Sequence, residues 1–120
     1  FEEVPAIALF TPSRLSVAIN PSWRGADPKT LAAVLAHEAS HLADYLRGAD
    51  MRSAAGCYRT EYAAFEAQAQ VWRGFYGPDG KAQPTTFLDV ELNRILTEMT
   101  QNPQGFAASI AATYSRECSG

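Results

Sequence analysis

The sequence predicts a single α+β domain, in which a small β-sheet of at least a strand pair is followed by about four helices. Three observations predict it: alternating residues near the amino terminus, helix-capping signals along the rest of the chain, and a length of 120 residues, the usual size of one domain. With 47% hydrophobic and 19% charged residues, the composition is that of a packed globular chain. We therefore expect residues 1–120 to share one core.

The strand pair is predicted from two short runs, residues 6–10 and 14–20, on either side of a Thr-Pro-Ser sequence. In the second run Leu15, Val17 and Ile19 alternate with polar or small residues. This alternation is typical of a strand with one buried face. We expect the two runs to pair and to bury the face that carries these three residues.

The first helix has signals at both ends. Asp27 followed by Pro28 is typical of a helix start, because Asp caps the first turn and Pro suits the first helical position. Helix-favouring residues then continue to Gly48, a suitable residue for a helix end. We expect this helix to span residues 28–47.

Three further helices follow. The second covers about residues 58–76 and stops at a Gly-Pro pair, and Thr86 with Asp89 and Asn102 with a following proline begin the third and fourth. Their apolar residues recur at helical spacing and are typical of a core-facing side. We assign to the core Leu88, Leu92, Ile95 and Met99 of the third helix, and Phe106, Ile110 and Tyr114 of the fourth.

Charge and apolar run length exclude two classes of partner. Ten Lys and Arg against thirteen Asp and Glu give a net charge of -3 without a basic cluster, so we expect no nucleic-acid partner. The longest apolar runs fall far below the roughly 18 residues that cross a bilayer, so we expect no membrane span. The sequence begins at Phe1 without a targeting segment, and we interpret it as a processed product or an excised domain. It leaves the oligomeric state open.

The chain has two cysteines, Cys57 and Cys118. They are too few and too far apart for a cysteine-based zinc site. They can form one disulfide, which would favour an extracytoplasmic or secreted location. The alternative is two buried thiols, which would suit a reducing compartment.

The candidate metal-binding and catalytic residues lie in the sequence His37-Glu38-Ala39-Ser40-His41, in the middle of the first predicted helix. At about 100° per residue, the two histidines lie on one face, and both imidazoles can reach one metal ion. Glu38 lies to the side of the pair, where its carboxylate can reach a metal-bound water without being a ligand.

Glu38 is expected on the buried stripe of this helix. The stripe consists of Leu31, Val34, Leu35, Leu42 and Leu46. No Lys or Arg lies one turn from Glu38 to neutralise it, and burying an unpaired carboxylate is costly. A metal-bound water would supply the missing partner and make Glu38 the general base.

An HExxH sequence on a helix that follows a strand and a loop resembles the active-site helix of the zincin metalloproteases. The resemblance implies a zincin-like fold, a Zn²⁺ ion and hydrolysis of peptide bonds. The chain has only two histidines, so the xxGxxH extension of the metzincins is absent. The third ligand must then be a carboxylate or, as a less favoured alternative, Cys57.

Glu61 is the preferred third ligand. Together with Ala64 it resembles the ExxA element of the second zinc helix in glutamate zincins of the thermolysin-like type, at a similar spacing from His41. A helical wheel places Glu61 beside the core-facing stripe of its helix and Glu66 further from it, so Glu66 is the alternative. Phe65 departs from the thermolysin-like pattern, which has an acidic residue at that position.

Two further roles stay open at this level. Asp44 lies one turn beyond His41, either as a carboxylate that orients the site or as an exposed helix aspartate. Tyr58, Tyr114 and Arg116 are candidates for stabilising an oxyanion, and the sequence assigns the role to none of them.

These features predict a zinc metalloendopeptidase, a hydrolase in which His37, His41 and Glu61 hold zinc and Glu38 acts as the general base. Its substrate is a peptide or protein, which the strand at 14–20 would align by main-chain pairing. The alternative is a non-enzymatic zinc-binding or protein-interaction module.

Overall fold

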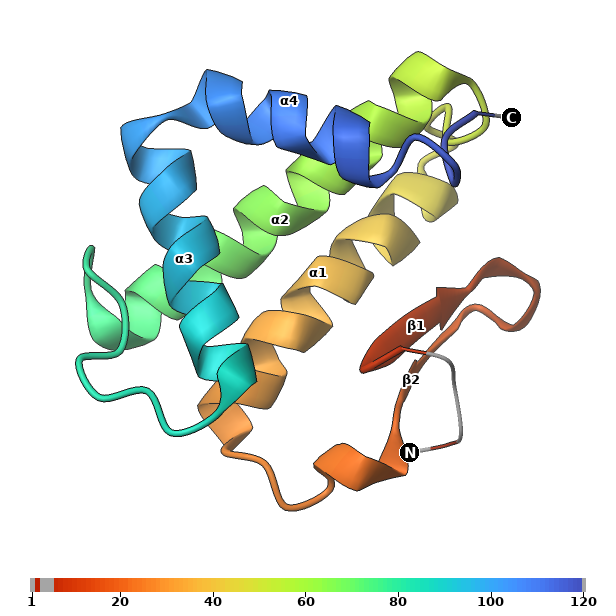
Figure 1. Cartoon of the computed structure of the whole chain (residues 1–120). Coiled ribbons are helices and arrows are strands. Elements are labelled where there is room, and N and C mark those ends of the chain that lie inside the picture. Colours follow the sequence, from red (N-terminus) through yellow and green to blue (C-terminus); the bar gives the residue numbers. More distant parts are fainter. Residues whose placement is uncertain (1, 3–5, 120) are drawn as a thin grey trace.

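The computed structural model describes residues 2 and 6–119. Over these residues a two-stranded antiparallel sheet is followed by four α-helices, which confirms the predicted α+β class (Figure 1). The elements are β1 (Ala8–Thr11), β2 (Ser16–Ile19), α1 (Pro28–Leu46), α2 (Ala54–Tyr76), α3 (Phe87–Gln101) and α4 (Pro103–Thr113). None of these helices is long and apolar enough to cross a membrane.

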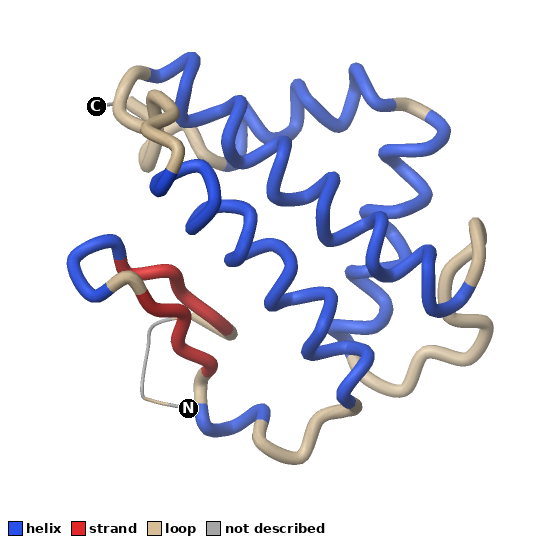
Figure 2. Tube along the Cα trace, turned by 180° about the vertical axis from the view of Figure 1, so that it is seen from behind, coloured by secondary structure: helices blue, strands red, loops and turns tan. Residues whose placement is uncertain are grey.

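The helices α1 and α2 run antiparallel and form the centre of the molecule (Figure 1). α3 and α4 pack against α2 on one side, and the hairpin of β1 and β2 lies along α1 on the other, as the view from behind also shows (Figure 2). α1 therefore contacts both the sheet and the other helices.

The hairpin is shorter than predicted, and a short 3-10 helix at Pro12–Arg14 makes its turn. The strands pair in antiparallel register with Phe10 opposite Val17, on the face that also carries Ile19. Val17 and Ile19 are half-buried, but Leu15 is 53% exposed. Leu15 follows the 3-10 helix with a positive φ of 48° and lies outside the strand, so its assignment to the buried face is wrong.

Both ends of α1 lie close to the predicted positions. The Asp27 side chain accepts a hydrogen bond of 2.8 Å from the Lys29 backbone N–H, and Pro28 occupies the first helical position. The helix ends at Leu46, one residue before the predicted end, and Gly48 turns the chain with a φ of 75°, which glycine adopts without strain.

The buried face of α1 differs from the predicted leucine stripe. Leu35 and Leu46 are exposed, and the buried residues are Thr30, Ala33, Val34, His41 and Asp44. The physical reason is the size of the hairpin, because two strands of four residues each are too short to cover every leucine on that side. The main contact of α1 is with α2, and α1 buries its smaller and more polar face there.

The other three helices begin at capped residues. α2 begins four residues before its predicted start, because the Ser53 hydroxyl accepts a hydrogen bond from the Gly56 N–H at 3.0 Å. α3 and α4 begin where predicted, with Thr86 and Asn102 as their N-caps. The predicted core residues Leu88, Leu92, Ile95, Phe106 and Ile110 are buried, and Met99 and Tyr114 are half-buried.

A buried carboxylate joins the starts of α1 and α3. Asp89 is fully buried and accepts hydrogen bonds from Thr30 Oγ1 at 2.8 Å, Lys81 Nζ at 2.9 Å, and both the N–H and the hydroxyl of Thr85 at 3.0 Å. Burial opposes ionisation of this carboxyl group, but these donors outweigh it and hold the pKa of Asp89 well below its usual value. Every donor is supplied from within the chain, so this cluster is structural.

Replacing this carboxylate is expected to destabilise the fold. Asp89→Asn removes the charge that Lys81 faces and should lower the free energy of unfolding by about 3 kcal/mol, as for other broken buried pairs. In the parent, the folded pKa lies below the unfolded value of about 3.9, so this stabilisation is present above about pH 4 and is lost as pH falls further. Urea unfolding at several pH values measures both effects.

The matched control is Asp79→Asn, which changes an exposed aspartate in the turn between α2 and α3. It should unfold at the same urea concentration as the parent at neutral pH. An Asp89→Asn midpoint equal to that of the control would contradict the role assigned to this cluster.

Candidate metal centre

Three potential metal ligands converge between α1 and α2. His37 and His41 lie on successive turns of α1, and Glu61 lies opposite them on α2. His41 Nε2 is 2.9 Å from Glu61 Oε1, and His37 Nε2 is 3.6 Å from Glu61 Oε2. One ligand atom from each of the three residues lies within 4.8 Å of the others, so together they could hold a metal ion.

The environment of these residues fits a cation. Glu61 Oε2 is buried and has no hydrogen-bond partner among the described residues, although buried polar atoms are usually paired. Burial alone would raise the pKa of Glu61, but the hydrogen bond from His41 and the nearby His37 imidazole outweigh it and lower that pKa to about 2. The carboxylate is therefore ionised at neutral pH, as a metal ligand must be.

The two alternative ligands lie elsewhere. Glu66 is exposed on the part of α2 that faces a separate surface hollow with Arg73, away from the histidines. Cys57 is bonded to Cys118 in a disulfide, so it has no free thiolate, and its assignment as a possible ligand is wrong.

Phe65 lies beside His37, at the position where the thermolysin-like pattern has an acidic residue. Its ring packs edge-on against the His37 imidazole, with the ring centroids 4.5 Å apart. His37 therefore has an apolar ring contact at the position where the thermolysin-like pattern has an acidic residue.

Glu38 is a half-buried residue of α1, and its side chain reaches β1. Its Oε2 atom accepts a hydrogen bond of 3.0 Å from the Phe10 backbone N–H, a partner that the sequence does not reveal because the two residues are 28 positions apart. No Lys or Arg one turn away pairs with this carboxylate, as expected, but a metal-bound water is not needed to give it a partner, because the backbone of β1 supplies one. Burial raises the pKa of Glu38.

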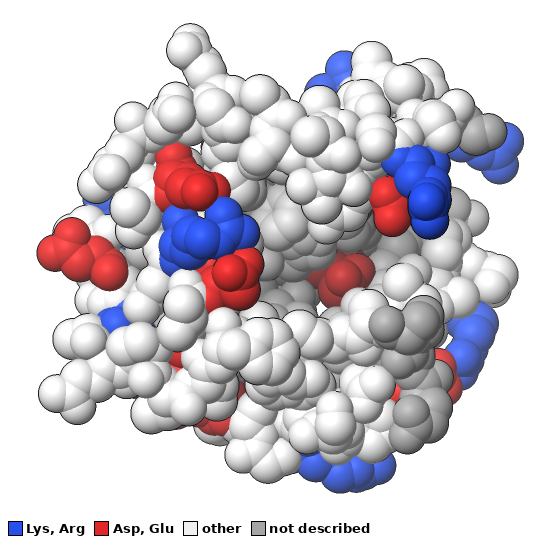
Figure 3. Space-filling view, in the orientation of Figure 1, with Lys and Arg blue, Asp and Glu red and all other residues white. Residues whose placement is uncertain are grey.

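The surface beside these residues is hollowed. A cavity of about 490 Å³ is lined by His37, Glu38, His41 and Glu61, together with β1 and the chain beyond α4. Acidic atoms lie in the central hollow of the face shown in Figure 3. The side chains are thus open to a ligand.

Asp44 is buried, so its interpretation as an exposed helix aspartate is wrong. Its Oδ1 atom accepts hydrogen bonds from Arg47 Nε at 2.9 Å and Arg47 Nη2 at 2.7 Å. Its Oδ2 atom and His41 Nδ1 are both buried without a hydrogen-bond partner in the described part of the chain. Asp44 thus brings negative charge to the side of His41 that faces away from Glu61.

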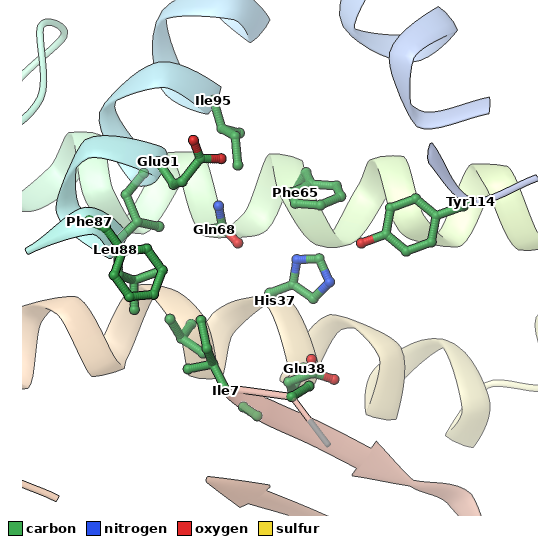
Figure 4. Close-up of a pocket in the computed structure, with 14 residues that line it drawn as sticks. Ile7, His37, Glu38, Phe65, Gln68, Phe87, Leu88, Glu91, Ile95 and Tyr114 are labelled. Atoms are coloured by element: carbon green, nitrogen blue, oxygen red, sulfur yellow. The ribbon is translucent and has the colours of Figure 1, made fainter. Parts of the chain in front are cut away.

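Tyr114 is the one oxyanion candidate whose side chain lines the site. It follows α4, lines the cavity with the histidines, and turns its hydroxyl toward His37 (Figure 4). Burial and the charge of Glu61 raise the pKa of this hydroxyl, so it stays protonated. Tyr58 packs against the cluster formed by Ile95, Phe106 and Ile110, and Arg116 is exposed.

Comparison with protein-family models, with curated proteins and with solved structures found no match to this chain.

The disulfide between Cys57 and Cys118 lies at the edge of the site, where Cys57 lines the same cavity as the histidines. Cys57 lies one turn before Glu61 on α2, and Cys118 lies one turn beyond Tyr114. The bond therefore ties the segment that carries Tyr114 to the helix that carries Glu61.

Removing this disulfide is expected to cost about 4 kcal/mol in the free energy of unfolding, because it closes a long loop with a sequence separation of 61 residues. The measurement is guanidinium unfolding of the parent and of the double variant Cys57→Ser with Cys118→Ser. Adding reductant should lower the parent's midpoint toward that of the variant and leave the variant unchanged. An oxidised parent with the same midpoint as the variant would contradict the expected contribution.

Proposed function

We propose that the chain is a zinc metallopeptidase of the zincin type, which hydrolyses peptide bonds. His37, His41 and Glu61 would hold the ion, and Glu38 would act as the general base. The observation that carries the proposal is the convergence of three ligand atoms within 4.8 Å, beside a fourth residue whose carboxylate is open to the same cavity. Two histidines and a glutamate are a typical ligand set of catalytic zinc.

When zinc is bound to such a set, it lowers the pKa of a bound water and polarises a carbonyl group. Glu38 would take a proton from that water and give it to the leaving amine. Its raised pKa suits this exchange, because a carboxyl group with a pKa nearer neutrality both accepts and returns a proton readily. The protonated Tyr114 hydroxyl would donate a hydrogen bond to the oxygen of the scissile carbonyl.

The strand that borders the cavity is β1, and we propose it in place of residues 14–20 as the strand that aligns the substrate. Asn20 N donates to Ile7 O, so alternate residues Ile7 and Leu9 pair with β2. The backbone groups of Ala8 and Phe10 therefore point away from β2, and both residues line the cavity. The Phe10 N–H already donates to Glu38 Oε2, so the groups left for a substrate on this edge are the Phe10 carbonyl and the N–H and carbonyl of Ala8. An extended peptide can pair with this edge.

We also propose an extracytoplasmic or secreted location. A disulfide between Cys57 and Cys118 persists in an oxidising compartment and is rare where thiols are kept reduced. The pairing is the only feature of the described residues that bears on location.

The metal ligands are tested by zinc affinity. We expect one zinc per chain in protein prepared without chelator, and a loss of affinity of at least about tenfold for Glu61→Gln, because a missing ligand costs no less than a missing ligand-orienting contact. Glu66→Gln, on the same helix and exposed, is the matched control and should leave affinity unchanged. Competition with a chromogenic chelator measures both. A loss of zinc affinity in Glu66→Gln but not in Glu61→Gln would identify Glu66 as the third ligand.

The general base is tested by Glu38→Gln. The amide keeps the shape of the side chain but cannot accept the proton of a water, so turnover of a fluorogenic peptide should fall by roughly two to four orders of magnitude. Zinc content should stay at the parent level. Comparable turnover in the variant would overturn the mechanism, and a zinc-loaded parent that cleaves no peptide of a diverse library would favour the non-enzymatic zinc-binding module.

A further inference from the structure

A second cavity, of about 290 Å³, adjoins the proposed metal site (Figure 4). His37 and Glu38 line both cavities, so the second one opens directly beside the reacting groups. Its other walls come from α1, α2, α3 and the chain before β1. They are mostly apolar and include Val34, Phe65, Leu88, Leu92 and Ile95.

One polar side chain interrupts these apolar walls. Gln68 of α2 is only 6% exposed, and its side chain lies between those of Glu91 and His37 (Figure 4). No residue in the described part of the chain gives its amide a hydrogen bond. The Gln68 amide atoms are not among the buried unpaired side-chain atoms of the described chain, so they are open to the cavity that Gln68 lines. The amide is therefore available to whatever fills the cavity.

The charges around the cavity limit which chemical groups can bind in it. Glu91 lies on the cavity wall away from the metal ligands and is paired with Arg94, at 2.8 Å between Glu91 Oε2 and Arg94 Nη2. The described lining includes no Lys or Arg. An acidic side chain would meet Glu38 and Glu91 without a cation that lines the cavity.

We propose that this cavity binds a substrate side chain next to the scissile bond, and that Gln68 selects a side chain with an apolar body and a hydrogen-bonding end that is not acidic, such as tyrosine or glutamine. This proposal rests on the proposed peptidase function.

The selection follows from the cost of desolvation. A wholly apolar side chain that fills the cavity excludes water and leaves the Gln68 amide unpaired. A tyrosine hydroxyl or a glutamine amide of the same overall size restores the hydrogen bond and keeps the apolar contacts. Sites that pair a buried polar group with the substrate discriminate strongly against analogues that lack the partner.

The test uses pairs of cleavable peptides that differ at one residue beside the scissile bond, tyrosine against phenylalanine and glutamine against methionine. In the parent, kcat/KM should favour the hydrogen-bonding member of each pair by at least about fivefold, as one hydrogen bond allows. Gln68→Leu should bring the ratio to about one. Gln70→Leu is the matched control, because Gln70 is exposed on the same helix, and it should keep the parent ratio.

A second readout does not depend on cleavage. In the zinc-loaded Glu38→Gln chain, the side-chain amide resonance of Gln68, identified by its loss in Gln68→Leu, should shift with the tyrosine peptide and much less with the phenylalanine peptide. The zinc affinity of Gln68→Leu should equal that of the parent.

Equal rates for both members of each pair in the parent, or a preference that survives Gln68→Leu, would overturn the proposal. An amide resonance that responds equally to both peptides would also overturn it. If no peptide is cleaved but the resonance shifts selectively, the peptidase function fails and the selective cavity stands.

Discussion

The antiparallel contact between α1 and α2 is the constraint on which the rest of the structure depends. Both helices bury small residues: Ala33 of α1, which packs in one cluster with Ala69 of α2, and Ala64 of α2. Small side chains let helix axes approach closely, because the ridges of one helix then fit into the grooves of the other. This approach lets short-range contacts form between the α1 histidines and Glu61 of α2. The hairpin, α3 and α4 then enclose a site whose main members already meet.

The parts of the fold that the sequence reveals are those decided within a few residues. The side chains of Asp27, Thr86 and Asn102 accept hydrogen bonds from backbone N–H groups two or three residues ahead. The local sequence therefore predicts where these helices begin. The spacing of His37 and His41 is also local, since any helix places them on one face. Glu61 needed a helical-wheel argument and a family resemblance, because its place opposite them depends on how two helices pack.

The errors concern contacts between distant segments. The leucine stripe assumed that a sheet covers one whole side of α1, and a hairpin of two short strands cannot do so. The hydrogen bond from Phe10 to Glu38 and the burial of Asp44 each depend on tertiary placement. The disulfide was one of the two states predicted for the cysteines, and the error there is the assignment of Cys57 as a possible ligand. Gln68 gives no signal in the sequence, because its unpaired amide is defined only once three helices surround it.

Two groups of buried polar atoms in this molecule differ in whether the chain itself supplies their hydrogen-bond partners. Asp89 is surrounded by donors from its own chain, and its carboxylate is fully hydrogen-bonded. Beside the histidines, Glu61 Oε2, Asp44 Oδ2 and the Nδ1 atoms of both histidines are buried without partners in the described chain. A metal ion on the proposed ligands would satisfy Glu61 but not the Nδ1 atoms, which point away from it. Asp44 lies one turn from His41 and brings negative charge near that imidazole, but its free oxygen and His41 Nδ1 form no hydrogen bond in the structure. These unpaired atoms therefore gather around the candidate metal site, and the packing of the remaining core offsets the cost of burying them.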